Sequence, residues 1–278
     1  MKLTFHLPYM AQWGDTLEVT IHLLTTGGRD KTENVAMHTD DGLNWVAEYN
    51  VLHSWHQAFN AIFYTYQLRA ANGEMRRREC NPVPRAVALS PNRDYTFYDN
   101  WLDLPLHWQR MADQSGVVVN LRPDKVVIPP VPMSRLTVVL NARAYGLLPH
   151  EQIGVLGDAP TLGSWLVNRY LPMTKIGDNA WTVAINADMI EHFPLLYKYV
   201  IVDSDTRKMK YWERGDNRTL RAVDDTPQNK VIVHNDNTVR ISRDAIYEAK
   251  MPSAREDEER NQASYDYKKL RTSDNQRI

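Results

Sequence analysis

The chain has 278 residues, of which 43% are hydrophobic and 24% charged, with 33 basic residues against 34 acidic ones and a formal net charge of -1. This length and apolar content suffice for two modest cores, and the balanced charge gives no reason to expect nucleic acid or a membrane as a partner. The single cysteine, Cys80, excludes an internal disulfide framework and favours a reducing compartment.

The N-terminal residues alternate between apolar and polar types and are interrupted early by His6 and Pro8, so they lack the continuous apolar stretch of a signal peptide. No other stretch approaches the roughly 20 apolar residues that cross a bilayer. The sequence therefore predicts a soluble, cytoplasmic chain. Neither a cofactor, nor a nucleic acid, nor a membrane is expected to bind it.

Short β-branched, aromatic and alternating segments recur through residues 1–100, separated by turn signals such as Asp41-Gly42 and Asn72-Gly73. This pattern is typical of a small antiparallel sandwich, and helical periodicity is almost absent. The expected strands are 3–7, 17–23, 34–38, 43–49, 61–69 and 95–98.

Residues 101–133 are expected to connect this first domain to a second one. Proline-rich sequence sets a semi-rigid spacing, and the aromatic residues Trp101 and Trp108 are too apolar to lie free, so this part should fold back on the first sandwich. The prolines of the connector are Pro105, Pro123, Pro129, Pro130 and Pro132.

A second sandwich is predicted over residues 134–242, followed by a charged tail at 243–278 that is too poor in large apolar residues to fold alone and is either disordered or a solvated helix. The fold class is therefore all-β, with two immunoglobulin-like antiparallel β-sandwiches in tandem and a charged C-terminal tail. The expected strands of the second sandwich are 136–142, 152–156, 181–185, 195–203, 209–212 and 230–234.

The second sandwich resembles the starch-binding domain, carbohydrate-binding module family 20. The resemblance rests on three motifs in family order, namely Leu162-Gly163-x-Trp165, Tyr197-Lys198-Tyr199, and Trp212-Glu213 followed by Asn217-Arg218. It implies a main carbohydrate site made by Trp165, Lys198, Trp212 and Asn217, with Glu213 at its edge.

The residue types fit this role on physical grounds as well. A glucose ring has apolar faces and hydroxyl edges, so it needs a flat apolar platform and a few hydrogen-bonding groups. Trp165 and Trp212 are suited to the platform, Lys198 supplies three donors, and Asn217 supplies both a donor and an acceptor. A structural interpretation stays open, in which both tryptophans belong to the core and Lys198 is a solvated strand residue.

The first sandwich resembles the second, which makes an internal repeat of about a hundred residues. Trp13-Gly14 corresponds to Tyr145-Gly146, Trp45 to Trp181, and residues 64–66 to residues 197–199. The opening Leu7-Pro8-Tyr9 with Gln12-Trp13-Gly14 is similar to the start of disproportionating 4-α-glucanotransferases of the amylomaltase type, glycoside hydrolase family 77, which carry two starch-binding domains ahead of a catalytic barrel.

The first copy departs from the family pattern where the main site would lie. It has no Leu-Gly-x-Trp motif, Thr65 replaces the lysine, and arginines 76–78 replace the second tryptophan. Its main site is expected to be lost. Trp13, Tyr145 and Trp181 are candidates for second sites, whereas Trp45 is more simply a half-buried strand anchor.

Hydrolysis or transfer on α-glucan needs two carboxylates about 5–10 Å apart in a cleft, and no barrel of about 250 residues exists in this chain to carry them. His53 and His56 lack a third ligand and indicate a polar loop more than a metal site. We therefore expect α-glucan polysaccharide or maltooligosaccharide binding by the non-catalytic front of a 4-α-glucanotransferase. The alternative is a free-standing β-sandwich for protein interaction or glucan tethering, and whether an enzyme is attached stays open.

Overall fold

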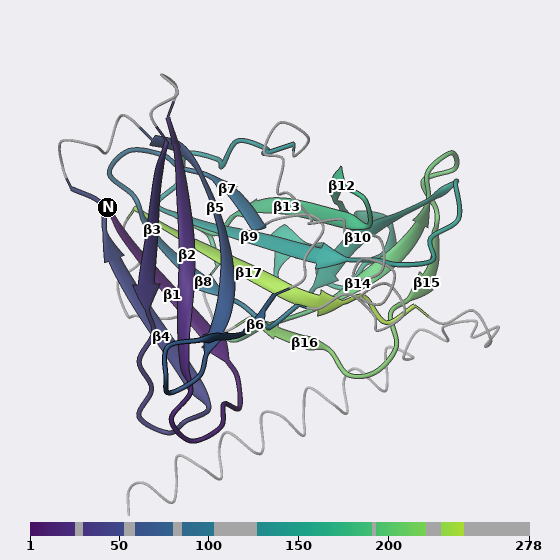
Figure 1. Cartoon of the computed structure of the whole chain (residues 1–278). Helices are drawn as coiled ribbons and strands as arrows, with labels where there is room; N and C mark the ends of the chain where they lie inside the picture. Colours follow the sequence, from purple (N-terminus) through teal and green to yellow (C-terminus); the bar gives the residue numbers. More distant parts are fainter. Residues whose placement is uncertain are drawn as a thin grey trace, which may run out of the picture. The chain divides into compact units, whose positions relative to one another are not determined.

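The computed structural model describes residues 1–25, 30–52, 59–79, 85–102, 127–190, 193–220 and 229–241, apart from the side chain of Asn237. Residues Met1–Ile241 form one unit and Ser242–Ile278 another, and the predicted charged tail lies outside the described residues. The described part consists of strands, turns and two short 3-10 helices, which confirms the all-β prediction (Figure 1). No helix in these ranges has the length and apolar character needed to cross a membrane.

The first sandwich packs a sheet containing β1, β4 and β8 against a five-stranded sheet in the order β3-β2-β5-β6, with β7 also paired to β5. Alternate residues of β1 are fully buried, as the sequence pattern predicts for a strand with one core face. The strands are β1 (Lys2–Pro8), β2 (Thr16–Thr25), β3 (Lys31–Ala36), β4 (Asn44–Asn50), β5 (Phe59–Arg69), β6 (Met75–Arg78), β7 (Arg85–Ala88) and β8 (Asp94–Tyr98).

One sheet of the second sandwich has the strand order β11-β10-β14-β15, with β16 also paired to β14. Its elements are β9 (Leu136–Arg143), β10 (Glu151–Gly157), η3 (Pro160–Leu162), η4 (Val167–Arg169), β11 (Leu171–Pro172), β12 (Thr174–Gly177), β13 (Ala180–Asn186), β14 (Leu195–Asp203), β15 (Met209–Trp212), β16 (Arg218–Leu220) and β17 (Lys230–Thr238).

Strand pairing is the same in both sandwiches. β1 pairs antiparallel with β4 and parallel with β8, as β9 does with β13 and β17. β5 pairs with β2, β6 and β7, as β14 does with β10, β15 and β16. The main strands of the two halves of the described chain therefore follow one topology, so positions on these paired strands can be compared between the halves.

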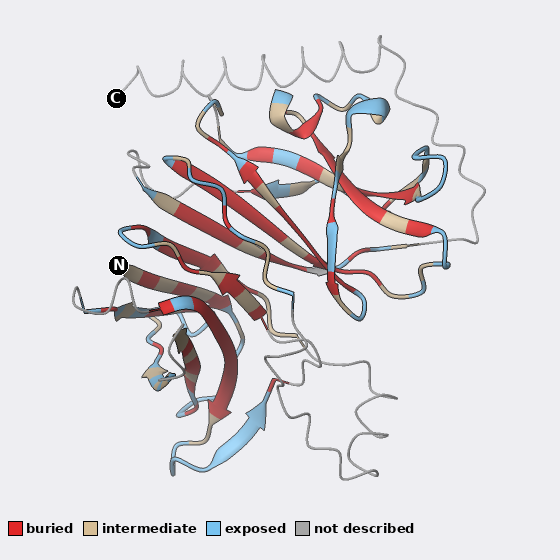
Figure 2. Ribbon diagram, turned by 90° about the horizontal axis from the view of Figure 1, so that it is seen from above, coloured by how far each residue is buried: buried red, intermediate tan, exposed pale blue. Residues whose placement is uncertain are grey.

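One continuous sheet runs through both sandwiches. Its order is β12-β13-β9-β17-β8-β1-β4, because β17 pairs in parallel with both β9 and β8. Val231 and Val233 lie in the core of the first sandwich, and Ile232 between them lies in the core of the second. Figure 2 shows buried residues, in red, along strands of both sandwiches. A strand buried on both faces reads as an uninterrupted apolar run, which is the pattern seen here.

The two halves are thus joined by backbone hydrogen bonds and not by a spacer alone. Arg93, just before β8, adds to this junction by donating to the carbonyl oxygens of Pro132 and Ser134 at 2.8 Å each and to that of Lys230 at 3.1 Å. The greater part of the predicted connector, residues 103–126, lies outside the described residues, and the predicted domain boundaries stay predictions.

A buried polar network is also repeated. In the second sandwich the hydroxyls of Tyr197 and Tyr199 each donate to Asp236 at 2.6 Å, and Arg218 bridges Asp236 and Glu213. In the first sandwich Tyr64 and Tyr66 donate to Asp99, and Arg85 bridges Asp99 and Glu79. Burial, and then the nearby aspartate charge, raise the pKa of all four tyrosines well above the usual value, so they remain donors.

Asn235 of β17 links the two halves through hydrogen bonds. Its side-chain amide donates to Asp99 at 2.6 Å and to the Tyr64 hydroxyl at 2.9 Å, and it accepts a hydrogen bond from Asn141 at 2.8 Å. Because buried polar groups are costly when unpaired, this arrangement favours a single register between β8 and β17.

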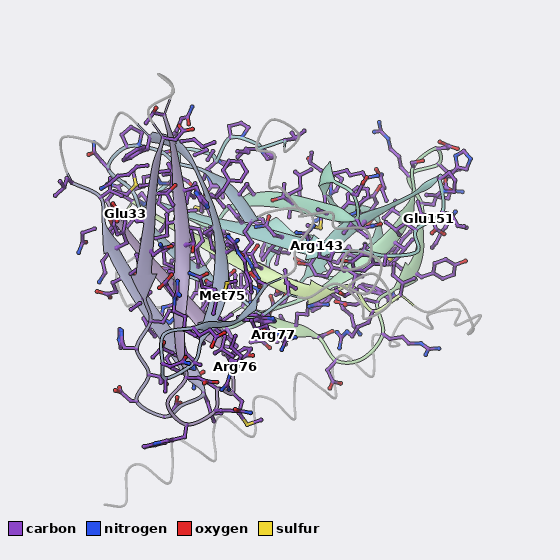
Figure 3. All side chains as sticks on the ribbon, viewed as in Figure 1. Glu33, Met75, Arg76, Arg77, Arg143 and Glu151 are labelled. Carbon is purple, nitrogen blue, oxygen red and sulfur yellow. The ribbon has the colours of Figure 1, made fainter. Side chains whose placement is uncertain are left out.

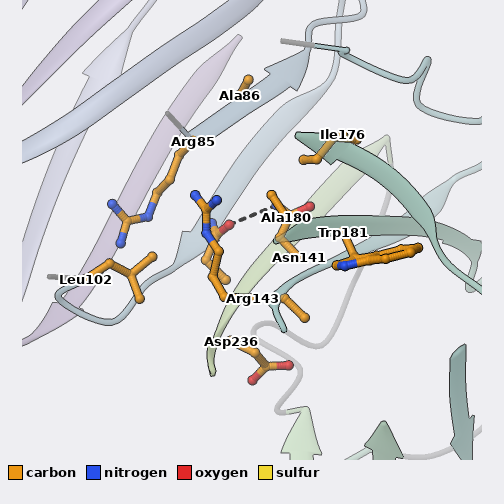
Figure 4. A pocket seen from close by; sticks show the side chains of 11 residues that line it. Arg85, Ala86, Leu102, Asn141, Arg143, Ile176, Ala180, Trp181 and Asp236 are labelled. Atoms are coloured by element: carbon orange, nitrogen blue, oxygen red, sulfur yellow. Dashed lines mark hydrogen bonds between the residues drawn. The ribbon is translucent and has the colours of Figure 1, made fainter. Parts of the chain in front are cut away.

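Figure 4 shows a small cavity beside this link, towards which the side chains of Arg85 and Arg143 point. Its volume of about 20 Å³ accommodates roughly one water molecule and no sugar. Burial, with the Arg85 charge acting in the same direction, lowers the pKa of Arg143 to about 10. Trp181 lines this cavity and is only 7% exposed, so it is poorly placed for the second carbohydrate site suggested by its sequence position.

Candidate functional site

The loop after β10 directs Trp165 back over the sheet. Gly163 has a φ of 83°, and Ser164 and Trp165 follow with φ values of 48° and 60°, so three successive residues adopt the left-handed conformation. The backbone N–H of Trp165 donates to the carbonyl of Gly157 at 2.8 Å and closes the loop. Non-glycine residues in this conformation carry a cost that is met mainly at functional sites.

Glycine is required at position 163 for two reasons. Its φ lies in the left-handed region, and a Cβ there would meet the Arg169 carbonyl oxygen at 2.4 Å. Backbone atoms cannot move aside as a flexible side chain can. The glycine of the Leu-Gly-x-Trp motif thus permits the loop shape that positions Trp165.

We expect Gly163→Ala to destabilise the chain more than Gly146→Ala does. Gly146 also has a positive φ, of 75°, but a Cβ there meets nothing within 4 Å. The control therefore carries only the backbone cost, about 1–2 kcal/mol, while Gly163→Ala adds the clash with Arg169. Urea unfolding of both variants gives the comparison. Equal destabilisation would contradict the proposed role of the close contact.

Trp165 and Trp212 form an angled aromatic pair on the outer face of the second sandwich. Their ring centroids are 6.2 Å apart with an interplanar angle of 52°. Both are half-buried and pack on an aliphatic bed formed by Leu156, Val200 and Val202. The structure thus brings together the two tryptophans that the sequence assigns to one platform.

Lys198 lies on the same face of the sheet. It is half-buried in β14 two residues before Val200, which pairs with Trp212, and side chains two apart on a strand point to the same side. Across the ladder it pairs with Leu156. Its ammonium group thus belongs to the face that carries both rings.

Glu213 follows Trp212 directly and therefore points to the opposite face, where it is 2% exposed. Its carboxylate accepts hydrogen bonds from Arg218 at 2.8 and 2.9 Å, from the Tyr199 N–H at 3.0 Å and from Arg240 at 3.3 Å. With both oxygens engaged, Glu213 does not lie at an exposed edge of the site. It is placed instead to hold the loop that carries Asn217.

Arg218 is the main partner of Glu213. Although burial lowers its pKa, the hydrogen bonds to Glu213 and the charges of Asp236 and Glu213 outweigh that effect and raise it. The Arg218 guanidinium therefore stays charged at neutral pH. Asn217, the neighbouring residue, is exposed at the end of the turn that leads into β16.

Tyr170 completes the surroundings of the platform and was not expected from the motifs. It packs beside the tryptophan pair, and its ring approaches Gly154 so closely that a Cβ there would lie 2.6 Å from Tyr170 Cδ2. A glycine inside a strand is the signal that could have predicted such an approach.

The remaining aromatic candidates lie elsewhere. Trp13 is fully exposed in the loop between β1 and β2, and Tyr145 is half-buried in the equivalent loop between β9 and β10. They therefore belong to different sandwiches. Trp45 is 6% exposed and its indole N–H donates to the Tyr9 carbonyl at 3.0 Å, as a strand anchor would.

The first sandwich has a polar face where the second has its platform. Arg78 pairs with Gln67, as Trp212 pairs with Val200. Gln67 and Arg69 both bind Glu18, the arginine through Nε at 3.1 Å. Arginine 78 and its polar neighbours thus replace the second tryptophan and the aliphatic bed, in line with the departures seen in the sequence.

Among the described residues, no three His, Cys, Asp or Glu side chains are grouped as a metal ion would need. His53 and His56 lie outside the described ranges.

Comparison with protein families finds a match for the second sandwich. Residues 136–232 match the family model described as the starch binding domain, CBM_20, which confirms the family predicted for this part of the chain. No curated protein sequence matches the chain. The match extends from β9 into β17 and includes Trp165, Lys198 and Trp212.

Among solved structures, a glycoside hydrolase family 15 glucoamylase from Hypocrea jecorina gives a TM-score of 0.32 at 19% identity over 41% of this chain and 19% of its own length. The family 20 module of a maltotetraose-forming amylase from Pseudomonas saccharophila STB07 gives 0.29 at 15% identity over 36% of this chain and 99% of its own. A family CBM26 module from Eubacterium rectale Amy13K, in complex with maltoheptaose, gives 0.24 at 11% identity, with 88% and 99% covered.

Proposed function

We propose that the second sandwich binds starch- or glycogen-like α-1,4-glucan, or maltooligosaccharides derived from it, on the face formed by Trp165, Trp212, Lys198 and Asn217. One observation carries the proposal: two partly exposed indoles lie at 52° to each other on a buried aliphatic bed, within a segment that matches the starch binding domain model. Such rings offer apolar faces to sugar C–H groups at little entropic cost, because the bed already fixes them.

The angle between the rings favours a curved ligand. A helical α-1,4-glucan turns between successive glucose units, so two tilted platforms follow it better than one flat surface. Lys198 and Asn217 then supply donors and an acceptor for the hydroxyl edges. A neutral polymer also suits a chain whose net charge is -1.

We infer further that the chain is the non-catalytic front part of a cytoplasmic disproportionating 4-α-glucanotransferase and that its first sandwich is a second, altered starch-binding domain. The inference is supported by the common strand pairing and by the repeated network of Glu79, Arg85 and Asp99 with their equivalents. The resemblance of the opening residues adds to it. Whether the reading frame continues into a catalytic barrel decides this point directly.

A free-standing protein-interaction or glucan-tethering sandwich is the second candidate. The observation in its favour is the exposed apolar group around the β1–β2 loop, where Trp13 is fully exposed and Met10 is 81% exposed. Such side chains suit a protein partner as well as a sugar.

The test is native gel electrophoresis of the 278-residue chain with soluble starch, amylose or hydroxyethyl cellulose in the gel. We expect retardation by starch and amylose and none by the cellulose derivative, because the angled pair suits a curved chain. Equal mobility in all gels would refute glucan binding and leave the protein-interaction candidate.

A further inference from the structure

A hollow of about 440 Å³ lies where the two halves of the chain meet, close to the proposed glucan site. One wall is formed by Trp101 and Leu102, which follow β8 of the first half, and the opposite wall includes Asn217, Thr238 and Arg240 of the second half. Its volume falls within the range of about 300–1,000 Å³ that is usual for ligand pockets. No sequence motif pointed to it, because its walls come from both repeats.

Trp101 is held rigidly as one wall. The Leu102 N–H donates to the buried carboxylate of Glu79 at 2.7 Å, which fixes the backbone beside the ring. The ring centroid of Tyr9 lies 4.7 Å from that of the indole, and the Arg77 guanidinium lies 5.5 Å from the indole centroid. Figure 3 shows Arg77 together with Met75 and Arg76, which also belong to β6. The indole N–H is buried and finds no acceptor among the described residues.

The opposite wall is also held in place by hydrogen bonds. Arg240 donates to the carbonyl of Asp216 at 2.8 Å and to Glu213 at 3.3 Å. It also lies so close to Gly215 that a Cβ there would be 2.5 Å from its guanidinium. The loop that follows Trp212 is therefore held in place at the hollow, and Asn217 at its end lines the hollow and is also the residue that the sequence motif assigns to the glucan site.

The lining has the chemistry of a neutral sugar site. It combines one aromatic ring with an amide, a hydroxyl and guanidinium donors. The charge of Arg218 is matched by Glu213 and Asp236, and Arg240 contacts Glu213 and the Asp216 backbone, which disfavours an anionic ligand as the main occupant.

We propose that this hollow is an extension of the glucan site, in which an α-1,4-glucan lying on Trp165 and Trp212 continues past Asn217 and contacts the exposed part of Trp101. The inference rests on the proposed function of the platform. It makes the first half of the chain a contributor to binding through Trp101, although its own face lacks a platform. It also implies that long chains bind more tightly than short ones at a single continuous site.

Two variants test the extension by different means. Trp101→Ala removes the aromatic wall, and Thr238→Arg fills the hollow from an exposed position that does not touch the platform. Thr174→Arg makes the same change on the edge strand β12 and serves as the matched control. Binding to linear amylose and to maltotriose is measured by isothermal titration calorimetry.

We expect Trp101→Ala and Thr238→Arg to weaken amylose binding by roughly fivefold or more, the effect of an interface residue whose truncation costs about 1 kcal/mol. Maltotriose, which is accommodated by the platform alone, should bind as it does to the unmodified chain, and Thr174→Arg should change neither affinity. If Trp101→Ala fails to fold, Thr238→Arg still tests whether the hollow extends the glucan site.

The outcomes separate the two proposals. Loss of amylose binding alone supports the extension. Unchanged amylose affinity in both variants, or an equal loss on both ligands, would overturn it while leaving the platform in place. If the unmodified chain binds neither ligand, the proposed glucan function itself fails.

Discussion

Glu213→Ala is expected to lower the free energy of unfolding by about 3–5 kcal/mol, the usual cost of removing one partner from a buried ion pair. The substitution leaves the Arg218 guanidinium, whose side chain is 12% exposed, without its main carboxylate. It also leaves the buried Tyr199 N–H without the acceptor that now lies 3.0 Å away. Urea unfolding followed by circular dichroism measures the loss.

Glu48→Ala is the matched control for this effect. Glu48 pairs with Lys2 at 2.6 Å, but both side chains are more than 40% exposed, and such surface pairs contribute about 0–1 kcal/mol. Glu213→Gln keeps the shape and an acceptor oxygen and should fall between the two alanine variants. A Glu213→Ala variant no less stable than Glu48→Ala would show that the network does not hold the loop.

The fold class could be predicted because alternation along single strands is a local property. The seven-stranded sheet could not, since the pairing of β8 with β17 joins residues more than a hundred positions apart. The uninterrupted apolar run of Val231, Ile232 and Val233 was the available signal, and it indicates only that both faces are buried. It does not identify the strand on either side.

The site was predictable to a similar degree. The motifs indicated Trp165, Lys198 and Trp212, and the structure places all three on one face. Glu213 was harder to interpret, because one of the arginines that engage it, Arg240, lies 27 residues further along the chain. A carboxylate beside a binding tryptophan is indistinguishable in sequence from a direct ligand until its partners are known.

Comparison of the two sandwiches separates the residues that support the fold from those that form the platform. The first sandwich keeps the network of Glu79, Arg85 and Asp99 yet has Arg78 where the second has Trp212. The network is therefore compatible with a sandwich that has no aromatic platform. Conversely, the platform side chains lie on the outer face and are not needed to fill either main core.

That separation makes the double substitution Trp165→Ala/Trp212→Ala the sharpest test of the proposed function. Each ring should contribute about 2 kcal/mol or more to glucan binding as a central aromatic residue, while the fold survives because both side chains are half-exposed on the outer face. We expect β-cyclodextrin binding to disappear in calorimetry while the circular dichroism spectrum is retained.

The single variants should show that the two rings act together. Since their centroids are 6.2 Å apart, removing one disturbs the setting of the other, so either single substitution should already remove most of the β-cyclodextrin affinity. Trp13→Ala is the matched control, because Trp13 is fully exposed in a loop of the other sandwich and should leave β-cyclodextrin binding at the platform intact. A double variant that still binds β-cyclodextrin like the unmodified chain would place the glucan site away from this face.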